Sequence, residues 1–561
     1  MIHIQLIISI YLTFVFASYP DAIGKNGVVT SSNKYASEVG IEILQSGGNA
    51  IDAAIAVGFA LAVVHPGAGN IGGGGFMVIR LADGTVKTID FREVAPSAAY
   101  RDMFLDDSLN VVPNKSWSTS WAAGVPGSVA GFGMAHEKFG SLPWWKLLNP
   151  AIDLAQRGYK LDIANYSNLN SQYYSEYLKR DKEARKIFTK ENDYFELGEI
   201  FMQKDLARTL KRISRLGYEE FYTGKTAEMI IKCMNRTEGL ITLEDLKNYK
   251  PVLRDPISFD YRGYKIHSMP PASSGGVALA VILNQLENVD FSNIPYHSSE
   301  HIHYLSESER RAYADRAYFL GDIDYVPVPI EEMVNQEYAD LRFGEINPNK
   351  ASASDSVTHG EIEFNYDEKE ETTHYSVVDK WGNAVSVTTT VNGWYGNGIV
   401  VDGAGFLLNN EMDDFSSKPG TPNKYGLIGN AANAIEPGKR MLSSMTPTIV
   451  EDLDGNLFLV LGSPGGSTII TTVAQIIVNV IDYNMGIEDA VESPRFHHQW
   501  LPDMIQIERK GFSLETLNAL SEIGHDYSVR GSIGEANCIQ VKNGFIIGSG
   551  DSRRGASALA Y

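Results

Sequence analysis

The sequence predicts an α+β protein, in which antiparallel strand pairs and helical stretches occupy different parts of the chain. Residues 372–379 and 384–392 are alternating and β-branched around a Gly/Asn turn, which is the pattern of a hairpin. Residues 76–80 and 86–90 form a second strand pair around a turn at residues 82–84. Residues 127–250 instead repeat apolar side chains at helical spacing, for example at Leu206, Leu210 and Ile213. With 43% hydrophobic residues in 561, the chain can form a large folded core.

The chain begins with a short apolar segment, residues 2–17, that ends in small side chains near Ala17. Its length fits a secretory signal peptide better than a helix that spans a bilayer. We therefore expect residues 1–18 to be a signal peptide and the protein to be secreted or periplasmic. The segment lacks the Lys or Arg that usually precedes such a run, so an uncleaved N-terminal anchor is the alternative. No later stretch is long and apolar enough to span a membrane.

Two helices and a glycine-rich turn are expected next. Residues 37–44 have the pattern of an amphipathic helix, and residues 50–64 are apolar nearly all round, which is typical of a buried helix. Residues 67–72 match the dinucleotide pattern G-x-G-x-x-G, but that motif needs a following helix and here a strand follows. We therefore expect these glycines to let backbones approach closely beneath a site, or to pack a helix against a sheet.

The middle of the chain is expected to be structural. Thr242 begins a capped helix, and residues 269–276 form a turn before another apolar helix. Residues 298–345 are expected to add further helices with an acidic, aromatic surface. No chemistry is assigned to these segments. Further along the chain, residues 405–408 are expected to form a buried strand.

Charge and composition exclude several classes of protein. A net charge of −21 argues against nucleic-acid binding. The sequence contains no internal repeat, phosphate loop or metal-spaced Cys/His cluster, so neither a metal nor an organic cofactor is expected. The adjacent His497 and His498 cannot converge on one ion from a regular element and are expected to be structural, and Cys233 and Cys538 are expected to be buried thiols.

The hairpin of residues 372–392 carries an unusual polar face. Folding it about Trp381 places Thr372 opposite Thr390. Because side chains alternate along a strand, hydroxyls, an imidazole and an amide would share one face, from Thr372, His374, Ser376, Thr388, Thr390 and Asn392. This pattern predicts a polar cleft at the open end of the hairpin.

The segment before this hairpin is strongly acidic, with six carboxylates between residues 361 and 371. Such a run is typical of a solvated loop. Such a loop, running straight into a strand that begins with Thr, suits a cut between Glu371 and Thr372, whereas an isolated Thr in this pattern is expected to be an ordinary strand residue. The cut would leave Thr372 with a free α-amino group whose pKa lies near neutrality. That amine can act as the base that activates the hydroxyl of the same residue.

Several long motifs, in order along the chain, resemble the γ-glutamyltransferase (γ-glutamyl transpeptidase) family of the N-terminal-nucleophile hydrolases. The motifs are residues 66–76, 90–93, 371–379, 407–415, 442–448 and 462–467, and the likeness extends from about Asn26 to the C-terminus. The resemblance implies a four-layer αββα sandwich built from two chains after self-cleavage. The large chain would be residues 19–371 and the small chain residues 372–561, in one intertwined globular unit.

The resemblance also assigns a site for an α-amino acid. The position that matches Arg92 holds the substrate α-carboxylate in the family, a task that suits a planar guanidinium. The position of Asp414 receives the α-ammonium, and burial beside Arg92 is expected to keep Asp414 ionised. The remaining members of this implied site are Glu411 and Asn392, which assist Asp414, and Ser443 and Ser444, which hydrogen-bond the carboxylate.

The reacting end of the implied site lies elsewhere in the sequence. Gly465 and Gly466 offer two consecutive N–H groups that would hold an oxyanion, and Thr390 would support the nucleophile by hydrogen bonding. Tyr425 lies in the polar segment 419–439, where some family members have a lid whose Tyr covers the bound γ-glutamyl group. Such a lid would shield the acyl-enzyme from water.

The resemblance implies a γ-glutamyltransferase and glutathione hydrolase, with Thr372 as nucleophile. Its substrates would be glutathione and other γ-glutamyl compounds, with water, an amino acid or a dipeptide as acceptor. One alternative is a glutaryl or cephalosporin acylase of the same superfamily. The presence of Asp414 argues against it, because a glutaryl donor has no amine for this residue to hold. The other is a secreted, inactive homologue that acts as a binding protein, against which the intact set of site residues argues.

Overall fold

The predicted hairpin forms the centre of a sheet. Strand β10 (Thr373–Asp379) pairs with β11 (Ala384–Thr390) in antiparallel register, with Thr373 opposite Thr389. This is the register expected for a turn about Trp381. The turn needs Gly382, whose φ of 89° favours glycine.

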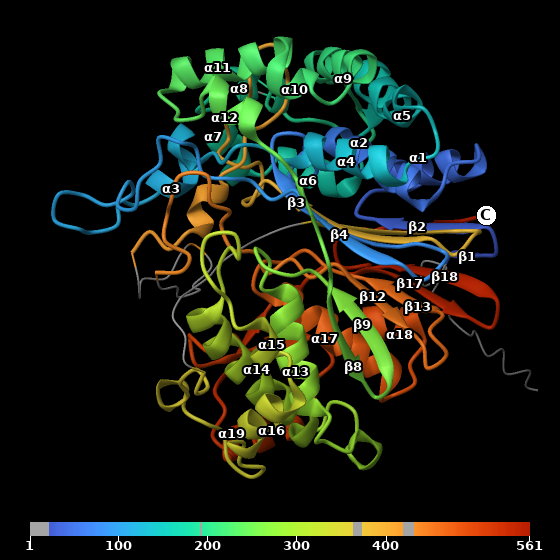
Figure 1. Ribbon diagram of the computed structural model, residues 1–561, viewed down its shortest axis with the longest axis vertical. Coiled ribbons are helices and arrows are strands. Elements are labelled where there is room, and N and C mark those ends of the chain that lie inside the picture. The colour runs from blue at the N-terminus through green and yellow to red at the C-terminus, as the bar shows by residue number, and fades with distance from the viewer. Residues whose placement is uncertain (1–21, 191–192, 363–372, 419–423, 425–430) are drawn as a thin grey trace, which may run out of the picture.

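The computed structural model describes residues 22–190, 193–362, 373–418, 424 and 431–561. Two seven-stranded sheets stack face to face, and helices cover the outer face of each sheet (Figure 1). The layer order is therefore helix, sheet, sheet, helix, and the predicted αββα sandwich is confirmed. Glu371, Thr372, Tyr425 and the signal segment 1–18 lie outside the described residues.

Each sheet combines strands from both sides of the acidic segment. The first sheet has the order β19 (Ser557–Ala560), β2 (Gly27–Ser31), β10, β11, β3 (Gly74–Arg80), β4 (Val86–Asp90) and β7 (Val252–Arg254). The second has the order β1 (Ala22–Gly24), β18 (Phe545–Gly550), β17 (Asn537–Lys542), β13 (Leu457–Leu461), β12 (Thr448–Glu451), β9 (Tyr264–Ser268) and β8 (Ile257–Tyr261). A cut before β10 would therefore leave both sheets as mixtures of the two products.

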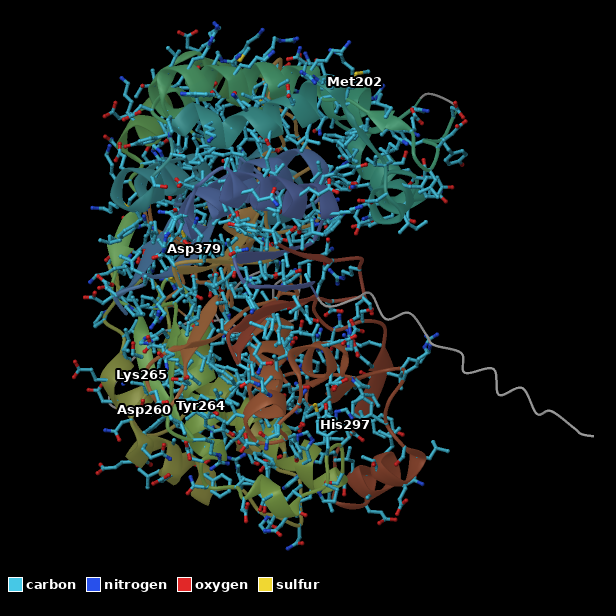
Figure 2. All side chains as sticks on the ribbon, turned by 90° about the vertical axis from the view of Figure 1, so that its right-hand side faces the viewer. Met202, Asp260, Tyr264, Lys265, His297 and Asp379 are labelled. Carbon is cyan, nitrogen blue, oxygen red and sulfur yellow. The ribbon has the colours of Figure 1, made fainter. Side chains whose placement is uncertain are left out.

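Two small sheets lie outside the sandwich. They are β5 (Tyr159–Lys160) with β6 (Ile200–Phe201), and β14 (Phe496–His497), β15 (Ile505–Glu508) and β16 (Tyr527–Arg530). At the edge of the second large sheet, Asp260 and Lys265 form an ion pair of 3.4 Å beside Tyr264, in the β8–β9 hairpin labelled in Figure 2.

The helices on the side of the first sheet belong to the N-terminal half (Figure 1). They are α1 (Lys34–Gln45), α2 (Ala50–Val64), α3 (Lys115–Ser118), α4 (Ser128–Phe139), α5 (Trp144–Arg157), α6 (Ile163–Leu169), α7 (Gln172–Leu178), α8 (Lys182–Phe188), α9 (Lys204–Leu216), α10 (Glu220–Thr223), α11 (Lys225–Thr237) and α12 (Leu243–Asn248). Every residue of α2 is buried, as its apolar sequence predicts. Thr242 caps α12, as predicted.

The helices against the second sheet come from the middle and the end of the chain. They are α13 (Gly275–Leu286), α14 (Ser299–Phe319), α15 (Ile330–Met333), α16 (Gln336–Gly344), α17 (Thr468–Ile481), α18 (Ile487–Glu492) and α19 (Leu514–Glu522). The prediction of an acidic, aromatic surface is wrong for α14, because most of its charged side chains are buried, and Glu307 pairs with Arg310 and Arg311 of the same helix. None of the described helices combines the length and the apolar composition that a bilayer crossing requires.

Asp379 ties the central hairpin to the helical layer above it. One carboxylate oxygen accepts a hydrogen bond from the N–H of Ala50, the first residue of α2, at 2.8 Å. The other accepts from the N–H groups of Trp381 and Asn383, which stabilises the turn. Figure 2 labels Asp379 at the level of the central strands. The carboxylate also lies at a helix N-terminus, where negative charge is favourable.

Three expectations about single residues have clear outcomes. Cys233 and Cys538 are buried and not bonded to each other, as predicted. His497 bonds Thr471 and Gln499 whereas His498 bonds Asp503, so the two rings do not converge and are structural. Residues 405–408 were expected to form a strand, but only Leu407 forms an isolated bridge, to Val400.

Candidate active site

The polar face of the hairpin is buried between the two sheets. His374 lies between the hydroxyls of Thr388 and Ser376, with each ring nitrogen 3.0 Å from one of them. The Ser376 hydroxyl donates in turn to the carbonyl of Asn537 in the opposite sheet. Burial lowers the pKa of His374 to about 3, so the ring is neutral. The prediction of a shared face is therefore confirmed for His374, Ser376 and Thr388.

The glycine-rich turn at residues 67–75 lies beneath the end of β11. A Cβ on Gly73 would lie 1.9 Å from the carbonyl oxygen of Thr390, and one on Gly72 would lie 2.1 Å from that of Leu407. The predicted close approach of backbones is thus confirmed. Asn70 holds the contact, because its Nδ2 donates to the Thr390 carbonyl at 2.7 Å and its Oδ1 accepts from the N–H of Gly73.

Asn392 connects the end of β11 to a carboxylate-rich turn. Its N–H donates to the Thr390 hydroxyl at 2.7 Å, and its Nδ2 donates to the carbonyl of Asn410 at 3.0 Å. Asn410 immediately precedes the 3-10 helix η4 (Glu411–Asp414). The Asn392 Oδ1 is buried and has no hydrogen-bond partner among the described residues.

Arg92, which is more than 300 residues earlier in the chain, binds this turn. It follows β4 and is fully buried. Its Nη2 donates to Asp414 Oδ2 at 2.5 Å, its Nη1 donates to Glu411, and its Nε donates to the carbonyl of Met441 at 3.2 Å. Glu93 adds a third carboxylate, 3.7 Å from Nη1.

The cluster contains three carboxylates and one guanidinium, so its acidic groups outnumber its basic group. Burial raises the pKa of Asp414 well above its ordinary value; Arg92 opposes the shift and Glu411 reinforces it. Burial likewise raises the pKa of Glu93 to about 7 and that of Glu411 well above its ordinary value, against the Arg92 charge. Arg92 lowers the pKa of Asp414, as expected, but burial raises it by more, because desolvation outweighs one guanidinium shared by three acids. A further cation in the cluster would favour their ionised forms.

Ser443 and Ser444 lie close to this cluster, two and three residues after Met441. Both are fully buried. The carbonyl of Ser443 accepts hydrogen bonds from the backbone N–H and the hydroxyl of Ser274, the latter at 2.7 Å. The Ser444 hydroxyl accepts from Nη2 of Arg316, on α14, at 2.7 Å.

Three further residues hold the backbone and side chains of the site in place, and the sequence did not predict a role for them. Arg316 joins Ser444 to Ser274, with its Nε 2.7 Å from the Ser274 hydroxyl. Asn433 donates to the Asp414 carbonyl at 2.5 Å and accepts from the N–H of Leu442. Asn70 is the third. Only Asn70 had a sequence signal, since it lies within the glycine motif.

Gly465 and Gly466 precede helix α17. Their φ angles of 136° and 64° lie in the region that favours glycine. Neither N–H donates a hydrogen bond to another described residue. Two such amides at the N-terminus of a helix of this length form an environment that favours negative charge. Gly465 and Gly466 therefore leave two backbone donors without a described partner next to the N-terminus of α17.

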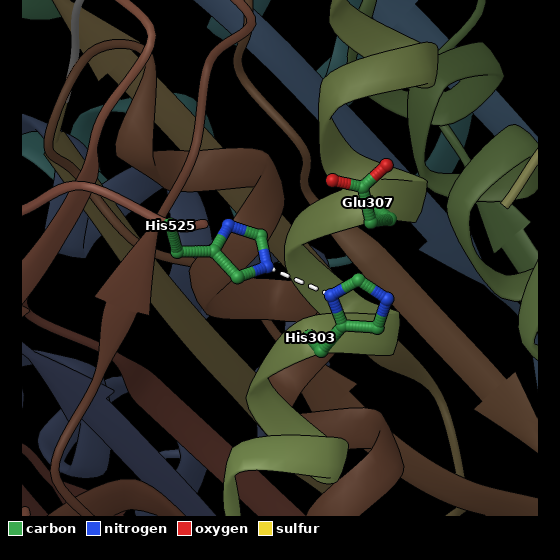
Figure 3. A group of neighbouring side chains, drawn as sticks. All are labelled: His303, Glu307 and His525. Atoms are coloured by element: carbon green, nitrogen blue, oxygen red, sulfur yellow. Dashed lines mark hydrogen bonds between the residues drawn. The ribbon is translucent and has the colours of Figure 1, made fainter. Parts of the chain in front are cut away.

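His303, Glu307 and His525 are the one group among the described residues whose ligand atoms converge closely enough for a metal ion (Figure 3). The two rings hydrogen-bond each other at 2.8 Å. The Glu307 carboxylate already pairs with Arg310 and Arg311, at 3.2 and 2.7 Å. Burial acts to raise the pKa of Glu307, but the two arginines lower it to about 2. Their charges would repel a cation, so we interpret this cluster as a structural hydrogen-bond network.

Comparison with known proteins identifies the family. A sequence model of the family described as gamma-glutamyltranspeptidase matches residues 36–561. The chain belongs to this family. The glutathione hydrolase proenzyme of Escherichia coli (strain K12) is 49% identical over 530 residues, which cover 94% of this chain and 90% of that protein. The γ-glutamyltranspeptidase fold thus extends over nearly the whole described chain.

Solved structures agree with this assignment. The Helicobacter pylori gamma-glutamyltranspeptidase is 46% identical, with a TM-score of 0.56 over 59% of this chain and 94% of that chain. A cephalosporin acylase from Bacillus halodurans is 25% identical, with a TM-score of 0.82 over 99% of both chains. The acylase shares the fold of this γ-glutamyltranspeptidase family member over nearly the whole chain, so the fold alone does not separate transferase from acylase.

Proposed function

We propose that the chain is a γ-glutamyltransferase and glutathione hydrolase. The observation that carries the proposal is the buried cluster of Arg92, Glu93, Glu411 and Asp414. Its excess of carboxylates suits the α-ammonium of a γ-glutamyl group. Five of the curated relatives, at 37–49% identity, are named glutathione hydrolase proenzyme.

The α-carboxylate of the same substrate would be held by Arg92, Ser443 and Ser444. A guanidinium carries five N–H donors, enough to retain both acids and to bind a carboxylate. The two serines follow Met441 by two and three residues, and the Met441 carbonyl already binds Arg92. Glu411 and Asn392 would assist Asp414 with the ammonium, because the Oδ1 atoms of Asn392 and Asp414 can accept hydrogen bonds and have no partner among the described residues.

Activation would require cleavage between Glu371 and Thr372. The Thr372 hydroxyl would attack the preceding carbonyl, and water would release the resulting ester. The products would be a large chain of residues 19–371 and a small chain of residues 372–561. The interleaving of strands in both sheets supports the proposal that the products stay together as one body. The word proenzyme in the names of the relatives agrees with such a step.

In turnover, the Thr372 hydroxyl would attack the γ-amide while its own α-amine takes the proton. The N–H groups of Gly465 and Gly466 would hold the oxyanion, and one such donor contributes about 10²–10³ in turnover. Thr390 would orient the nucleophile. The amide C–N bond breaks and the amine leaves with a proton. Water or an amino acid or dipeptide then cleaves the threonine ester, giving glutamate or a new γ-glutamyl amide. Tyr425 would cover the bound group.

The resemblance to a cephalosporin acylase supports glutaryl amides as the alternative substrate class. The transferase and the acylase differ in whether the donor substrate carries an α-amine. We would compare γ-glutamyl and glutaryl para-nitroanilides, with Thr372→Ala as the inactive control. Release from the γ-glutamyl compound alone supports the transferase, release from the glutaryl compound alone supports the acylase, and release from neither supports an inactive homologue. We also propose that the protein is secreted or periplasmic, because residues 1–18 have the pattern of a signal peptide.

A further inference from the structure

Helix α14 is buried over more than half of its length. Every residue from Leu305 to Arg316 is buried. Glu309, Tyr313 and Arg316 are spaced at i, i+4 and i+7, so their side chains leave the helix on one face. The helix axis advances about 10 Å over these residues. A long buried helix of this kind is a rigid support for the groups that bind to this face.

One end of the face holds the serine pair of the candidate site. Nη2 of Arg316 donates to the Ser444 hydroxyl at 2.7 Å, and Nε of Arg316 donates to the Ser274 hydroxyl at 2.7 Å. The Ser274 hydroxyl donates in turn to the carbonyl of Ser443 at 2.7 Å. Because the Ser444 hydroxyl accepts from Arg316, its own proton is available to a carboxylate. Arg316 therefore fixes the place proposed for the α-carboxylate of the donor.

The adjacent turn of the same face holds the segment that carries the glycine pair. The hydroxyl of Tyr313 donates to the carbonyl of Ser467, the residue after Gly466. The Ser467 hydroxyl donates to Oε1 of Gln499 at 2.7 Å, so its carbonyl and its hydroxyl are both bound. The Tyr313 ring packs edge-on against His497, with ring centroids 5.7 Å apart. Since Ser467 is the N-cap of α17, these contacts orient the glycine N–H groups that precede it.

Glu309 ties the same face to strand β14 and helix α17. Its carboxyl group accepts from the N–H of His498 at 2.8 Å and from Nε2 of Gln475, on α17, at 3.4 Å. The same Gln475 nitrogen donates to the carbonyl of Phe496 at 2.7 Å. Helix α14 is thus bound to the segment around α17 at two levels, through Tyr313 and through Glu309. It cannot slide along α17 without breaking both contacts.

A donor substrate has to satisfy both ends of the site at once. In a γ-glutamyl group two methylenes separate the α-carbon from the carbonyl carbon that is attacked, whereas a β-aspartyl group has one. In the proposed site the α-carboxylate binds at the serine pair and the oxyanion binds at the glycine pair. Both pairs are held by neighbouring turns of α14, through Arg316 and Tyr313. One rigid element therefore sets the separation between them.

We propose that α14 sets the length of the donor that the site accepts, with Tyr313 and Arg316 as positioning residues. The inference rests on the proposed γ-glutamyl transfer. A donor that is one methylene too short can satisfy one end of the site only. Helix α14 precedes the proposed cleavage point, whereas the serine and glycine pairs follow it. The large chain would therefore position binding groups that belong to the small chain.

The first variant tests the oxyanion end, with the full protein, γ-glutamyl and β-aspartyl para-nitroanilides as donors, and L-glutamate as competitive inhibitor. Tyr313→Phe should lower kcat/KM for the γ-glutamyl donor about tenfold, because the backbone donors lose their alignment. The inhibition constant of L-glutamate should change less than about twofold, because the head group is still held. The β-aspartyl donor, which does not reach these donors well, should react as before. The preference for the γ-glutamyl donor should therefore fall about tenfold.

The second variant tests the carboxylate end. Arg316→Gln should raise the inhibition constant of L-glutamate about tenfold and lower kcat/KM for both donors by the same factor. This is the pattern of an interaction made equally in the ground state and the transition state. Arg316→Lys keeps the charge but not the fork of donors, so it should restore part of the loss. It also serves as the test if Arg316→Gln does not fold.

Two buried residues away from the site provide matched controls. Tyr261→Phe removes a hydroxyl that donates to Asp482 at 2.7 Å, and Arg80→Gln removes a guanidinium that pairs with Glu451 at 2.6 Å. Both variants should keep the wild-type kinetic constants. Thermal unfolding of every variant measures its stability independently of these constants.

Two results would overturn the role of α14 and leave the proposed function standing. One is a set of wild-type constants in the Tyr313 and Arg316 variants. The other is a Tyr313→Phe protein whose inhibition constant for L-glutamate rises as much as its kcat/KM falls, because the two ends of the site would then not be positioned separately. Failure of the wild type to release para-nitroaniline from the γ-glutamyl donor would overturn the proposed function, and this inference with it.

Discussion

Nη2 of Arg92 lies 2.5 Å from Oδ2 of Asp414, across 322 residues of sequence. Arg92 follows a strand of the first sheet and Asp414 belongs to a 3-10 helix after the central hairpin. The two lie on opposite sides of the proposed cleavage point. Neither product could form the head-group site alone, so the site depends on the interleaved fold of the whole chain.

Asp414→Asn should mainly impair recognition of the donor. The variant removes the anion proposed to hold the α-ammonium, and truncating one partner of a buried charge pair costs about 2–5 kcal/mol. We expect kcat/KM for γ-glutamyl para-nitroanilide to fall about 10²-fold or more. Asp413→Asn is the matched control, since its buried carboxylate bonds Ser116 instead. Equal, small effects of the two substitutions would contradict the assignment.

Gly73→Ala tests the glycine turn beneath the site. The new Cβ would lie 1.9 Å from the Thr390 carbonyl, and backbone atoms must shift to relieve this overlap. We expect a loss of stability of about 1–3 kcal/mol and lower activity, because the end of β11 moves. Gly344→Ala, where no atom lies within 4 Å, should have neither effect. Urea unfolding of both variants, followed by an activity assay, checks this, and a stable, fully active Gly73→Ala protein would refute it.

His374 should make stability depend on pH. Its pKa is lowered from 6.5 to about 3 in the folded protein because the ring is buried. The unfolded chain therefore binds more protons between these values, and stability falls as the pH drops below 6.5. The contribution is about 2 kcal/mol between pH 7.5 and pH 5. Unfolding of wild type and His374→Gln at both pH values measures it. Parallel losses in the two proteins would exclude the effect.

The base proposed for Thr372 is its own α-amine. If so, kcat/KM should rise through a pKa near or somewhat above neutrality, as that amine loses its proton. A pH profile with γ-glutamyl para-nitroanilide checks this. A rate that is flat between about pH 5 and pH 10 would assign the base to another group.

The local features of the fold were predictable because each had a local cause. Alternation and a Gly turn determine the register of the 373–390 hairpin, and a run of apolar residues all round determines the burial of α2. The prediction of a strand at residues 405–408 was wrong, because an apolar run of four residues occurs in buried loops as well as in strands.

The site was only partly predictable, since its energetics arise from contacts between distant segments. The family motifs bring together Arg92, Glu411 and Asp414. No local pattern indicates that Glu93 would join them, or that desolvation would outweigh Arg92 and raise the pKa of Asp414. Arg316 escaped notice because it lies in an ordinary helical sequence, and only the tertiary fold brings it to Ser444.

The intact mass of the purified protein, measured beside Thr372→Ala, tests the central claim most directly. Self-processing predicts two chains for the wild type, the smaller one beginning at Thr372, and one uncut chain for the variant. A folded wild-type protein that stays in one piece would have no free amine at Thr372, and this result would contradict the proposed enzyme.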